Sequence, residues 1–280
     1  MIIDFRLRPP YGTLLTVPAP YGPRGKEIAG RLRIPFPESA QKQSMDMVLA
    51  EMEDAAITLG VATGRATAPG TSNDDLAQLC KDYPNRFLAI ATLDPRGQRD
   101  AMVAEFRRSV KQLDMRGLIL EPGASPRRLN VDDGSLYCLY EEAEALKVPV
   151  LYTLSNFVGA DIGYPLDNLI ALDRVCGDFP KVNFVVAHAG YPYVEAGLAL
   201  ALKRKNAYLS PDFYSMDDFP FAQEYFRAAN TYLQDQYLFG SAYPFYPLKP
   251  AVENNRAALR PAVQQKVFYD NAARLLGIAS

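Results

Sequence analysis

The sequence predicts an α/β fold, a (β/α)8 TIM barrel, and three observations carry this prediction. Short apolar runs typical of β-strands recur along the 280 residues, segments with helical period separate them, and the runs are about eight in number. Eight parallel strands are the number that closes such a barrel. The runs lie at residues 2–7, 55–62, 87–93, 117–122, 148–154, 182–188, 207–210 and 237–242.

Segments with helical period connect these runs. The segment 98–113 places Phe106, Val110 and Leu113 near one face, which is the pattern of an amphipathic helix packed on a sheet. Strands that alternate with helices favour βαβ units and a parallel sheet. Because no linker or internal repeat divides the chain, we expect one domain over residues 1–280. The other expected helices lie at 39–55, 72–83, 135–147 and 165–179.

The connection after the first strand, residues 9–38, is an exception to the short loops. It is rich in proline and glycine, and a loop of this length inside a compact domain is often functional. Since this long loop follows the first strand, we expect it beside the carboxyl ends of the strands, where barrel active sites lie. A lid, a plain surface excursion and a contact between subunits remain open for it.

The composition favours a small molecule as the ligand. The chain has 30 Lys and Arg residues against 32 Asp and Glu residues, so no basic surface indicates a nucleic acid or an anionic membrane as partner. The start MIIDFRLR lacks the pattern of a signal peptide, and no apolar run reaches the roughly 18 residues that a membrane span needs. We therefore expect a cytoplasmic protein with a small-molecule substrate. A homo-oligomer remains open.

The first strand carries charged residues at alternate positions, namely Asp4, Arg6 and Arg8. Side chains alternate between the two faces of a strand, so we expect all three to point toward one place. An arginine fork binds carboxylates, which indicates that Arg6 and Arg8 hold an anionic substrate or stabilise an oxyanion. A purely structural network, in which these three residues and Glu121 neutralise one another, is an equally open alternative.

His188 is the single histidine of the chain and ends the run 182–188. The pKa of an imidazole suits a general acid or base near neutral pH, so His188 is the first catalytic candidate. Asp4 and Glu121 are the other catalytic candidates, because each could orient the imidazole or pair with an arginine. Substrate-binding side chains are expected where later runs end or have just ended, at Tyr152, Thr153, Asp212 and Tyr243.

Four stretches, in this order, resemble the amidohydrolase-related family: IIDFRLR, FVVAHAGYPYVE, LFGSAYPF and FYDNAARLLGI. This is a metal-dependent hydrolase branch that also includes decarboxylases and lactonases. The resemblance implies a TIM barrel with a metal ion at the carboxyl ends of its strands. It implies as ligands two histidines ending the first strand, one ending the fifth, one ending the sixth, and an aspartate ending the eighth. In this sequence those places hold Arg6, Arg8, Thr153, His188 and Ala242.

Only His188 matches the ligand pattern that the resemblance implies. A guanidinium group is a cation without a lone pair to give to a metal, and zinc-like ions need several neutral or anionic donors. We therefore expect no metal and no cofactor. The predicted function is a metal-independent hydrolase of a small lactone, ester or amide that carries a carboxylate. A decarboxylase-type lyase, and a catalytically silent barrel that binds an anionic ligand or partner, are the alternatives.

Overall fold

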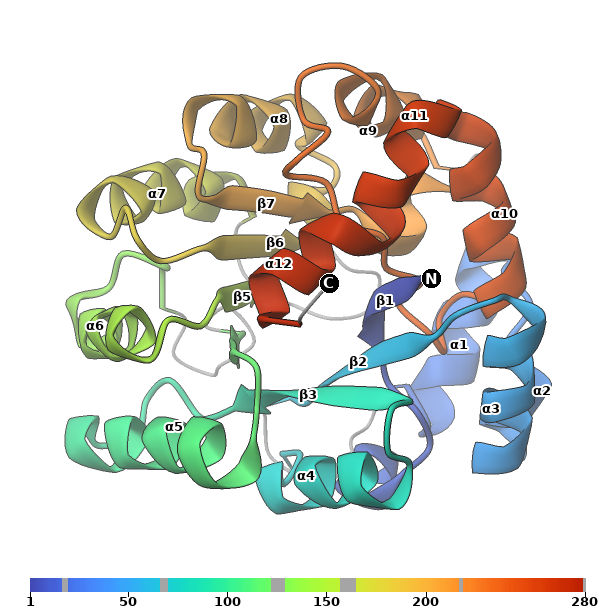
Figure 1. Ribbon diagram of the computed structural model, residues 1–280, viewed down its shortest axis with the longest axis horizontal. Coiled ribbons are helices and arrows are strands. Elements are labelled where there is room, and N and C mark those ends of the chain that lie inside the picture. The colour runs from blue at the N-terminus through green and yellow to red at the C-terminus, as the bar shows by residue number, and fades with distance from the viewer. Residues whose placement is uncertain (17–19, 66–69, 122–128, 157–164, 217–218, 279–280) are drawn as a thin grey trace.

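A parallel β-sheet curved into a nearly closed barrel forms the centre of the computed structural model (Figure 1). The structure describes residues 1–16, 20–65, 70–121, 129–156, 165–216 and 219–278. In this part of the chain, seven strands each pair in parallel with the next one in sequence order. The strands are β1 (Ile3–Leu7), β2 (Leu59–Thr63), β3 (Phe87–Thr92), β4 (Leu118–Leu120), β5 (Val150–Thr153), β6 (Phe184–Ala187) and β7 (Ala207–Ser210).

Residues 237–243 close the barrel between β7 and β1. Tyr237 pairs in parallel with Leu209 of β7, and Tyr243 pairs in parallel with Leu7 of β1. The expected eighth strand thus stands in the eighth place, although in the described residues it makes single bridges and not a regular ladder. The predicted TIM-barrel fold is confirmed, with an irregular eighth segment.

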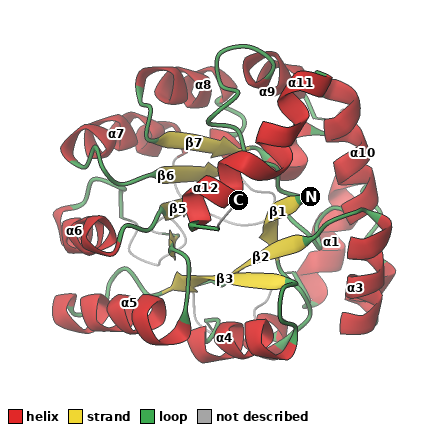
Figure 2. Cartoon of the chain, in the orientation of Figure 1, coloured by secondary structure: helices red, strands yellow, loops and turns green. Residues whose placement is uncertain are grey.

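Helices surround the strands (Figure 2). Each predicted helical segment is helical, but 39–55 is divided into α2 and α3 because Gln43 between them is left-handed, with φ = 51°. Ser44 then caps α3 by accepting a hydrogen bond from the Met47 amide. The helices are α1 (Pro23–Leu32), α2 (Glu38–Gln41), α3 (Met45–Asp54), α4 (Asn73–Asp82), α5 (Arg99–Leu113), α6 (Tyr137–Leu146), α7 (Pro165–Asp178), α8 (Val194–Lys203), α9 (Ala222–Ala229), α10 (Leu248–Ala258), α11 (Pro261–Gln265) and α12 (Asn271–Leu276).

Short 3₁₀ and π turns lie at several connections between the strands and helices. Two of them begin at predicted site residues: His188 directly follows β6, and Asp212 follows β7 after one intervening residue. The 3₁₀ turns are η1 (Gly12–Leu15), η3 (Gly134–Leu136), η4 (His188–Gly190) and η5 (Asp212–Ser215), and the π turn is η6 (Lys266–Asp270).

The segment 9–38 is not a plain loop, which corrects the prediction. It contains η1 and α1. Pro23 stands at the first position of α1, where its missing N–H is not needed, and Ile28 is buried on the inner side of the helix. The hydroxyl of Tyr21 donates to the backbone carbonyl of Arg8 at 2.5 Å, so this segment lies beside the carboxyl end of β1.

Strand β2 begins later than the apolar run 55–62 suggested. Ala55 and Ala56 instead end α3, because the Ala55 amide donates to the carbonyl of Glu51 and Ala56 is left-handed with φ = 57°. A left-handed residue is a common way to end a helix. Alternation of apolar residues alone does not separate such a helix end from the start of a strand.

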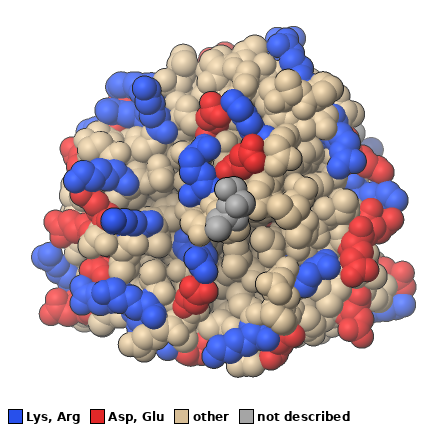
Figure 3. Space-filling view, in the orientation of Figure 1, with Lys and Arg blue, Asp and Glu red and all other residues tan. Residues whose placement is uncertain are grey.

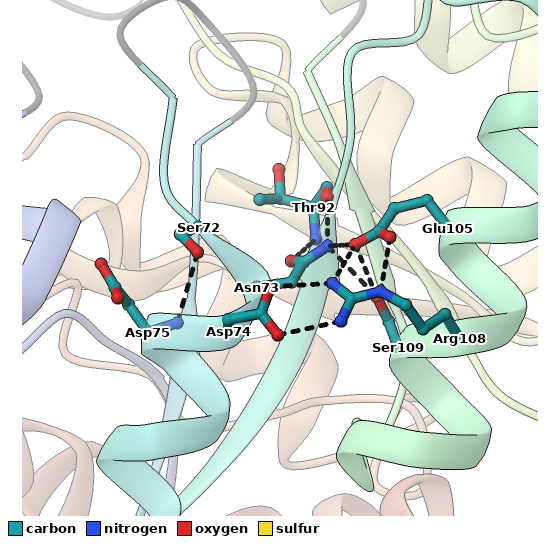
Figure 4. A network of polar contacts seen from close by, with 8 residues as sticks. All are labelled: Ser72, Asn73, Asp74, Asp75, Thr92, Glu105, Arg108 and Ser109. Carbon is teal, nitrogen blue, oxygen red and sulfur yellow. Dashed lines mark hydrogen bonds and ion pairs between the residues drawn. The ribbon is translucent and has the colours of Figure 1, made fainter.

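A polar network fastens α4 and α5 to β3 (Figure 4). The buried side chain of Asn73 donates to the Thr92 carbonyl and accepts from the Thr92 amide, both at 2.9 Å. Asn73 also donates to Glu105, which in turn pairs with Arg108, and Arg108 reaches back to Asp74. Because the side chain of Asn73, on α4, bonds to both β3 and α5, this network fixes the two helices relative to the strand.

Apolar side chains fill the barrel near the amino ends of its strands. Ile3 and Phe5 of β1 belong to a buried cluster with one or more residues from each other strand and with Leu275 and Leu276 of α12. The short helix α12 lies across this end of the barrel (Figure 1). The carboxyl ends of the strands, which carry the predicted site residues, are therefore at the end opposite α12.

The surface around α12 carries both signs of charge. Lys and Arg side chains are interspersed with Asp and Glu side chains on this face, and neither sign forms a broad patch there (Figure 3). Among the described residues, no helix has the length and apolar character needed to cross a membrane. The mixed charges therefore do not point to a large charged surface as the functional feature of this face.

Candidate active site

Polar and charged side chains from five strands or strand ends converge at the carboxyl end of the barrel. They line a pocket that is narrow, with less free space than a benzene ring fills, so a ring-sized ligand requires a side chain to move. Most of these lining side chains are buried, which makes their mutual pairing important for stability. The residues lining the pocket are Arg6, Arg8, Arg65, Glu121, Thr153, His188 and Phe245.

Arg6 stands at the centre of this group and is 3% exposed. Its Nη2 donates to Thr153 Oγ1 and contacts His188 Nε2, both at 3.3 Å. Its Nε lies 3.4 Å from Asp212 Oδ2, an ion pair within the barrel. Nη1 of Arg6 is buried and has no hydrogen-bond partner in the part of the chain that the structure describes. The guanidinium thus presents unused N–H donors in the pocket while its other side is held in place.

His188 and Asp212 form a buried pair. Nδ1 of His188 lies 3.0 Å from Asp212 Oδ2, and Ser210 Oγ is 2.5 Å from Asp212 Oδ1. Since a guanidinium can only donate, the contact with Arg6 makes His188 Nε2 the acceptor and places the single ring proton on Nδ1, facing the carboxylate. The pair therefore holds a neutral imidazole in one tautomer.

The pKa values of this pair follow from burial and from Arg6. Burial lowers the pKa of His188 to about 4, and the charge of Arg6 adds to this effect, which the attraction of Asp212 offsets only in part. Burial alone would raise the pKa of Asp212, but its contacts with His188 and Arg6 hold that pKa below its usual range. At neutral pH the pair is thus a neutral histidine beside an ionised aspartate.

Left-handed backbone positions aim this pair into the barrel. His188, Ala189 and Asp212 have φ values of 65°, 46° and 58°. Non-glycine residues rarely adopt such values, and they concentrate at functional sites where the surroundings hold them in place. Part of that support is Gly240, whose missing side chain leaves room for Asp212: a Cβ there would lie 2.6 Å from Asp212 Oδ1.

A second charged group consists of Arg8, Glu121 and Arg65. Nε of Arg8 donates to the Thr63 carbonyl at 2.9 Å, and its Nη2 is 3.9 Å from Glu121 Oε1, too long for a hydrogen bond. Arg65 donates to Glu121 Oε2 at 3.2 Å. Burial lowers the pKa of Arg8 to about 9. Burial would raise the pKa of Glu121, but the three arginines around the carboxyl hold it below its usual range.

Arg65 was not among the residues expected from the sequence. It follows the carboxyl end of β2 by two positions, and side chains there face the same end of the barrel as those after β4 and β6. In the run GVATGR a charged residue follows an apolar strand, and this pattern could have identified Arg65 as a site residue. Phe245, the aromatic residue of the pocket, likewise follows the eighth segment.

The carboxylate of Asp4 does not join the side chains of Arg6 and Arg8 in the pocket. Its Oδ1 accepts hydrogen bonds from the backbone amides of Arg6 at 3.0 Å and Ser241 at 2.9 Å. The register of β1 against β2 shifts between Asp4 and Leu7, and such an irregularity breaks the alternation of side chains. The expectation of one common direction thus fits Arg6 and Arg8, while Asp4 ties β1 to the eighth segment.

The two tyrosines expected to contact substrate lie outside the pocket. The hydroxyl of Tyr152 donates to that of Tyr140, in the buried layer between the barrel and its helices. The hydroxyl of Tyr243 is 2.6 Å from Ser39 Oγ, which donates to Glu51. The structure thus brings Arg6, Arg8, Glu121, Thr153, His188 and Asp212 together, and places Asp4, Tyr152 and Tyr243 elsewhere.

Comparison with known proteins gives one family match over nearly the whole chain. The sequence model of a family described as Amidohydrolase matches residues 3–278. An uncharacterized TIM-barrel protein from Bordetella bronchiseptica is 34% identical in sequence, and its crystal structure superposes with a TM-score of 0.91 over 99% of this chain and 98% of that chain.

Relatives of described activity are more distant. The crystal structure of 2,6-dihydroxybenzoate decarboxylase from Rhizobium is 18% identical, with a TM-score of 0.70 over 99% of this chain and 98% of that chain, which is a likeness of fold. The curated 2-amino-3-carboxymuconate-6-semialdehyde decarboxylase of Dictyostelium discoideum is 27% identical over 42% of this chain. That match spans 36% of the length of the Dictyostelium protein, about a third.

Proposed function

This chain belongs to the amidohydrolase family, and we propose that it is a lyase that removes carbon dioxide from a small aromatic carboxylic acid without a metal ion. The relatives support this choice, because proteins of the same fold include decarboxylases, one of them described as acting on 2,6-dihydroxybenzoate. The observation that carries the proposal is the buried guanidinium of Arg6, which contacts a histidine–aspartate pair and keeps free N–H donors.

Metal independence rests on the chemistry of the donor set. Within the described residues, no three His, Cys, Asp or Glu side chains come together where they could hold a metal ion. The guanidinium of Arg6 contacts both Thr153 and His188, which stand at two of the ligand places implied by the family resemblance. A fixed cation in that position repels a divalent ion and offers it no lone pair. These residues do not fit a metal, and no step below needs one.

Arg6 binds the carboxylate of the substrate in this proposal. A guanidinium forms charge-assisted, often bidentate hydrogen bonds with carboxylates, which are stronger than neutral ones. The buried Nη1 of Arg6 is available for such a bond, while Thr153 and Asp212 fix the rest of the group. Binding in a site with little water strengthens this attraction further.

His188 supplies the proton. Decarboxylation adds a proton to the ring carbon that carries the carboxylate, breaks the bond to CO₂ and returns its electron pair to the ring. A bound carboxylate offsets the charge of Arg6, which raises the pKa of His188 from its low value of about 4. Protonation of Nε2 replaces its contact with Nη2 of Arg6, which turns to the bound carboxylate. The imidazolium then gives its proton from Nε2, while Asp212 stabilises it at Nδ1. Solvent restores the proton in the next cycle.

Hydrolysis of a small carboxylate-bearing lactone, ester or amide is the second candidate. The neutral state of His188 favours it, since Nε2 of a neutral imidazole can take a proton from water. In either reaction Asp212 orients the imidazole, a part that the sequence had offered to Asp4 or Glu121. A barrel that binds the anion without turning it over is the third outcome to be tested.

An assay of carbon dioxide release separates these functions. We expect release from at least one member of a panel of hydroxybenzoates, unchanged by EDTA, and a fall of about 10² to 10⁴ in His188→Asn. Arg6→Met should lose activity as well, because it removes the group that binds the carboxylate. Its matched control is Arg96→Met, at an exposed arginine that pairs with Asp94. Loss of activity in EDTA would contradict metal independence. Acid production from lactones without CO₂ would favour the hydrolase, and binding without any product would favour the silent barrel.

A further inference from the structure

We infer that Arg8, Arg65 and Glu121 form a second acid-binding subsite beside Arg6, so that the preferred ligand of the pocket carries two acidic groups. All four side chains line the same pocket. The inference rests on the proposed function in one respect, because it takes this pocket as the place where the substrate binds. It adds the class of ligand, a small aromatic diacid, and a residue that sets the preference for it.

The hydrogen-bonding state of these groups gives the first argument. Among the residues that the structure describes, the buried Nη2 of Arg8 has no hydrogen-bond partner, and Oε1 of Glu121 lies 3.9 Å from it. Buried guanidinium N–H groups normally find a partner, and leaving one without a partner is unfavourable. Arg8 cannot turn away to find one, because its Nε is held by the Thr63 carbonyl. An acidic group of a ligand would satisfy this donor.

The balance of charge gives the second argument. Arg6 is paired with Asp212, so the excess charge lies with Arg8 and Arg65, which share the single carboxylate of Glu121. Two cations against one anion leave one positive charge in a buried place, where an unpaired charge is costly. The carboxylate that binds Arg6 leaves this positive charge in place. A second acidic group of the same ligand, bound at Arg8 and Arg65, neutralises it.

Accessibility singles out Arg65 as the residue that admits the ligand. Its side chain is 14% exposed, compared with 5% for Arg8 and 2% for Glu121. The narrow pocket requires a side chain to move before a ring can enter, and the most exposed member of the group is the one with room to do so. Arg65 is thus a specificity-determining residue, whereas Arg8 is fixed by its neighbours.

Calorimetric titration with benzoate and the three benzenedicarboxylates tests the inference directly. We expect at least one diacid to bind at least tenfold more tightly than benzoate. Arg65→Gln should remove this difference while benzoate affinity stays within threefold, and Arg65→Lys, which keeps the charge, should retain part of it. Glu121→Gln should strengthen diacid binding, a gain that an unfolded variant cannot imitate.

The outcomes separate this inference from the proposed function. Equal binding of all four acids, no binding of any, or a diacid preference that survives Arg65→Gln would overturn the second subsite. A diacid that binds tightly, loses its advantage in Arg65→Gln and releases no carbon dioxide would support the subsite and contradict the lyase. Release of carbon dioxide from a monoacid, without any preference for diacids in binding, would support the lyase and contradict the second subsite.

Discussion

Two buried residues near the arginines have pKa values displaced in opposite directions. Burial raises the pKa of Asp4 to about 7 from 3.8, whereas burial and Arg6 lower that of His188 to about 4 from 6.5. Relative to the unfolded chain, Asp4 favours the folded state fully below pH 3.8, and this contribution is lost as the pH rises through 7. His188 favours it fully above pH 6.5, and this contribution is lost as the pH falls through 4.

The pH-dependent contributions of Asp4 and His188 to stability therefore oppose each other in the same pH range. In Asp4→Asn, the contribution of His188 should become visible. With Asp4 removed from titration, we expect the free energy of unfolding to fall by about 3 kcal/mol between pH 6.5 and pH 4. Urea denaturation at a series of pH values measures this. Asp54→Asn, at an exposed carboxylate, is the control and should follow the wild-type curve. Parallel curves for Asp4→Asn and wild type would contradict the assignment.

At the residue scale, the sequence predicted which side chains carry charge but not which of them meet. Arg6, Arg8 and His188 lie together as alternation and strand ends indicated. Asp4 does not join them, because the irregular register of β1 turns its carboxylate toward backbone amides. A bulge has no clear signature in a single sequence, so strict period two was the only available rule.

At the scale of elements, the predicted strands and helices match because apolar periodicity reports burial directly. The mismatches arise where local backbone geometry decides. Ala56 ends α3 inside an apolar run, and α1 forms in a segment that is rich in proline and glycine. The eighth segment is irregular for a similar reason, since Ala242 is left-handed with φ = 57° and the Ser241 amide bonds to a side chain.

Gly240 in that eighth segment provides a test at the element scale. A Cβ at this position would lie 2.6 Å from Asp212 Oδ1 and 2.9 Å from Ser210 Oγ, so Gly240→Ala pushes the segment against the carboxylate that orients His188. We expect the variant to lose about 1–3 kcal/mol of stability, the usual range for overpacking a core.

The control for this prediction is Gly30→Ala in α1. A Cβ there meets nothing within 4 Å, and the position lies inside a helix, so the substitution should leave stability unchanged or raise it by up to about 1 kcal/mol. Thermal or urea unfolding of both variants provides the comparison. Equal stability of Gly240→Ala and wild type would show that the eighth segment can move without disturbing Asp212.

At the scale of the whole molecule, the two ends of the barrel differ in kind. Helix α12 and an apolar cluster close the end at the amino termini of the strands. The opposite end holds three arginines, one glutamate and the pair of His188 and Asp212. The order of motifs predicted this barrel from the sequence. The pairing of side chains within the site is decided by the closed barrel, because the partners come from strands distant in the chain.

The central claim is that a neutral His188 lies against the charge of Arg6 in a site that binds anions. His188 is the chain's single histidine, so NMR observes this imidazole without assignment. From pH 8 to pH 5 we expect the shifts of a neutral ring, consistent with a pKa of about 4. Benzoate or Arg6→Met should raise that pKa, and Arg96→Met should not. Titration near pH 6.5 that responds to neither benzoate nor Arg6→Met would contradict the claim.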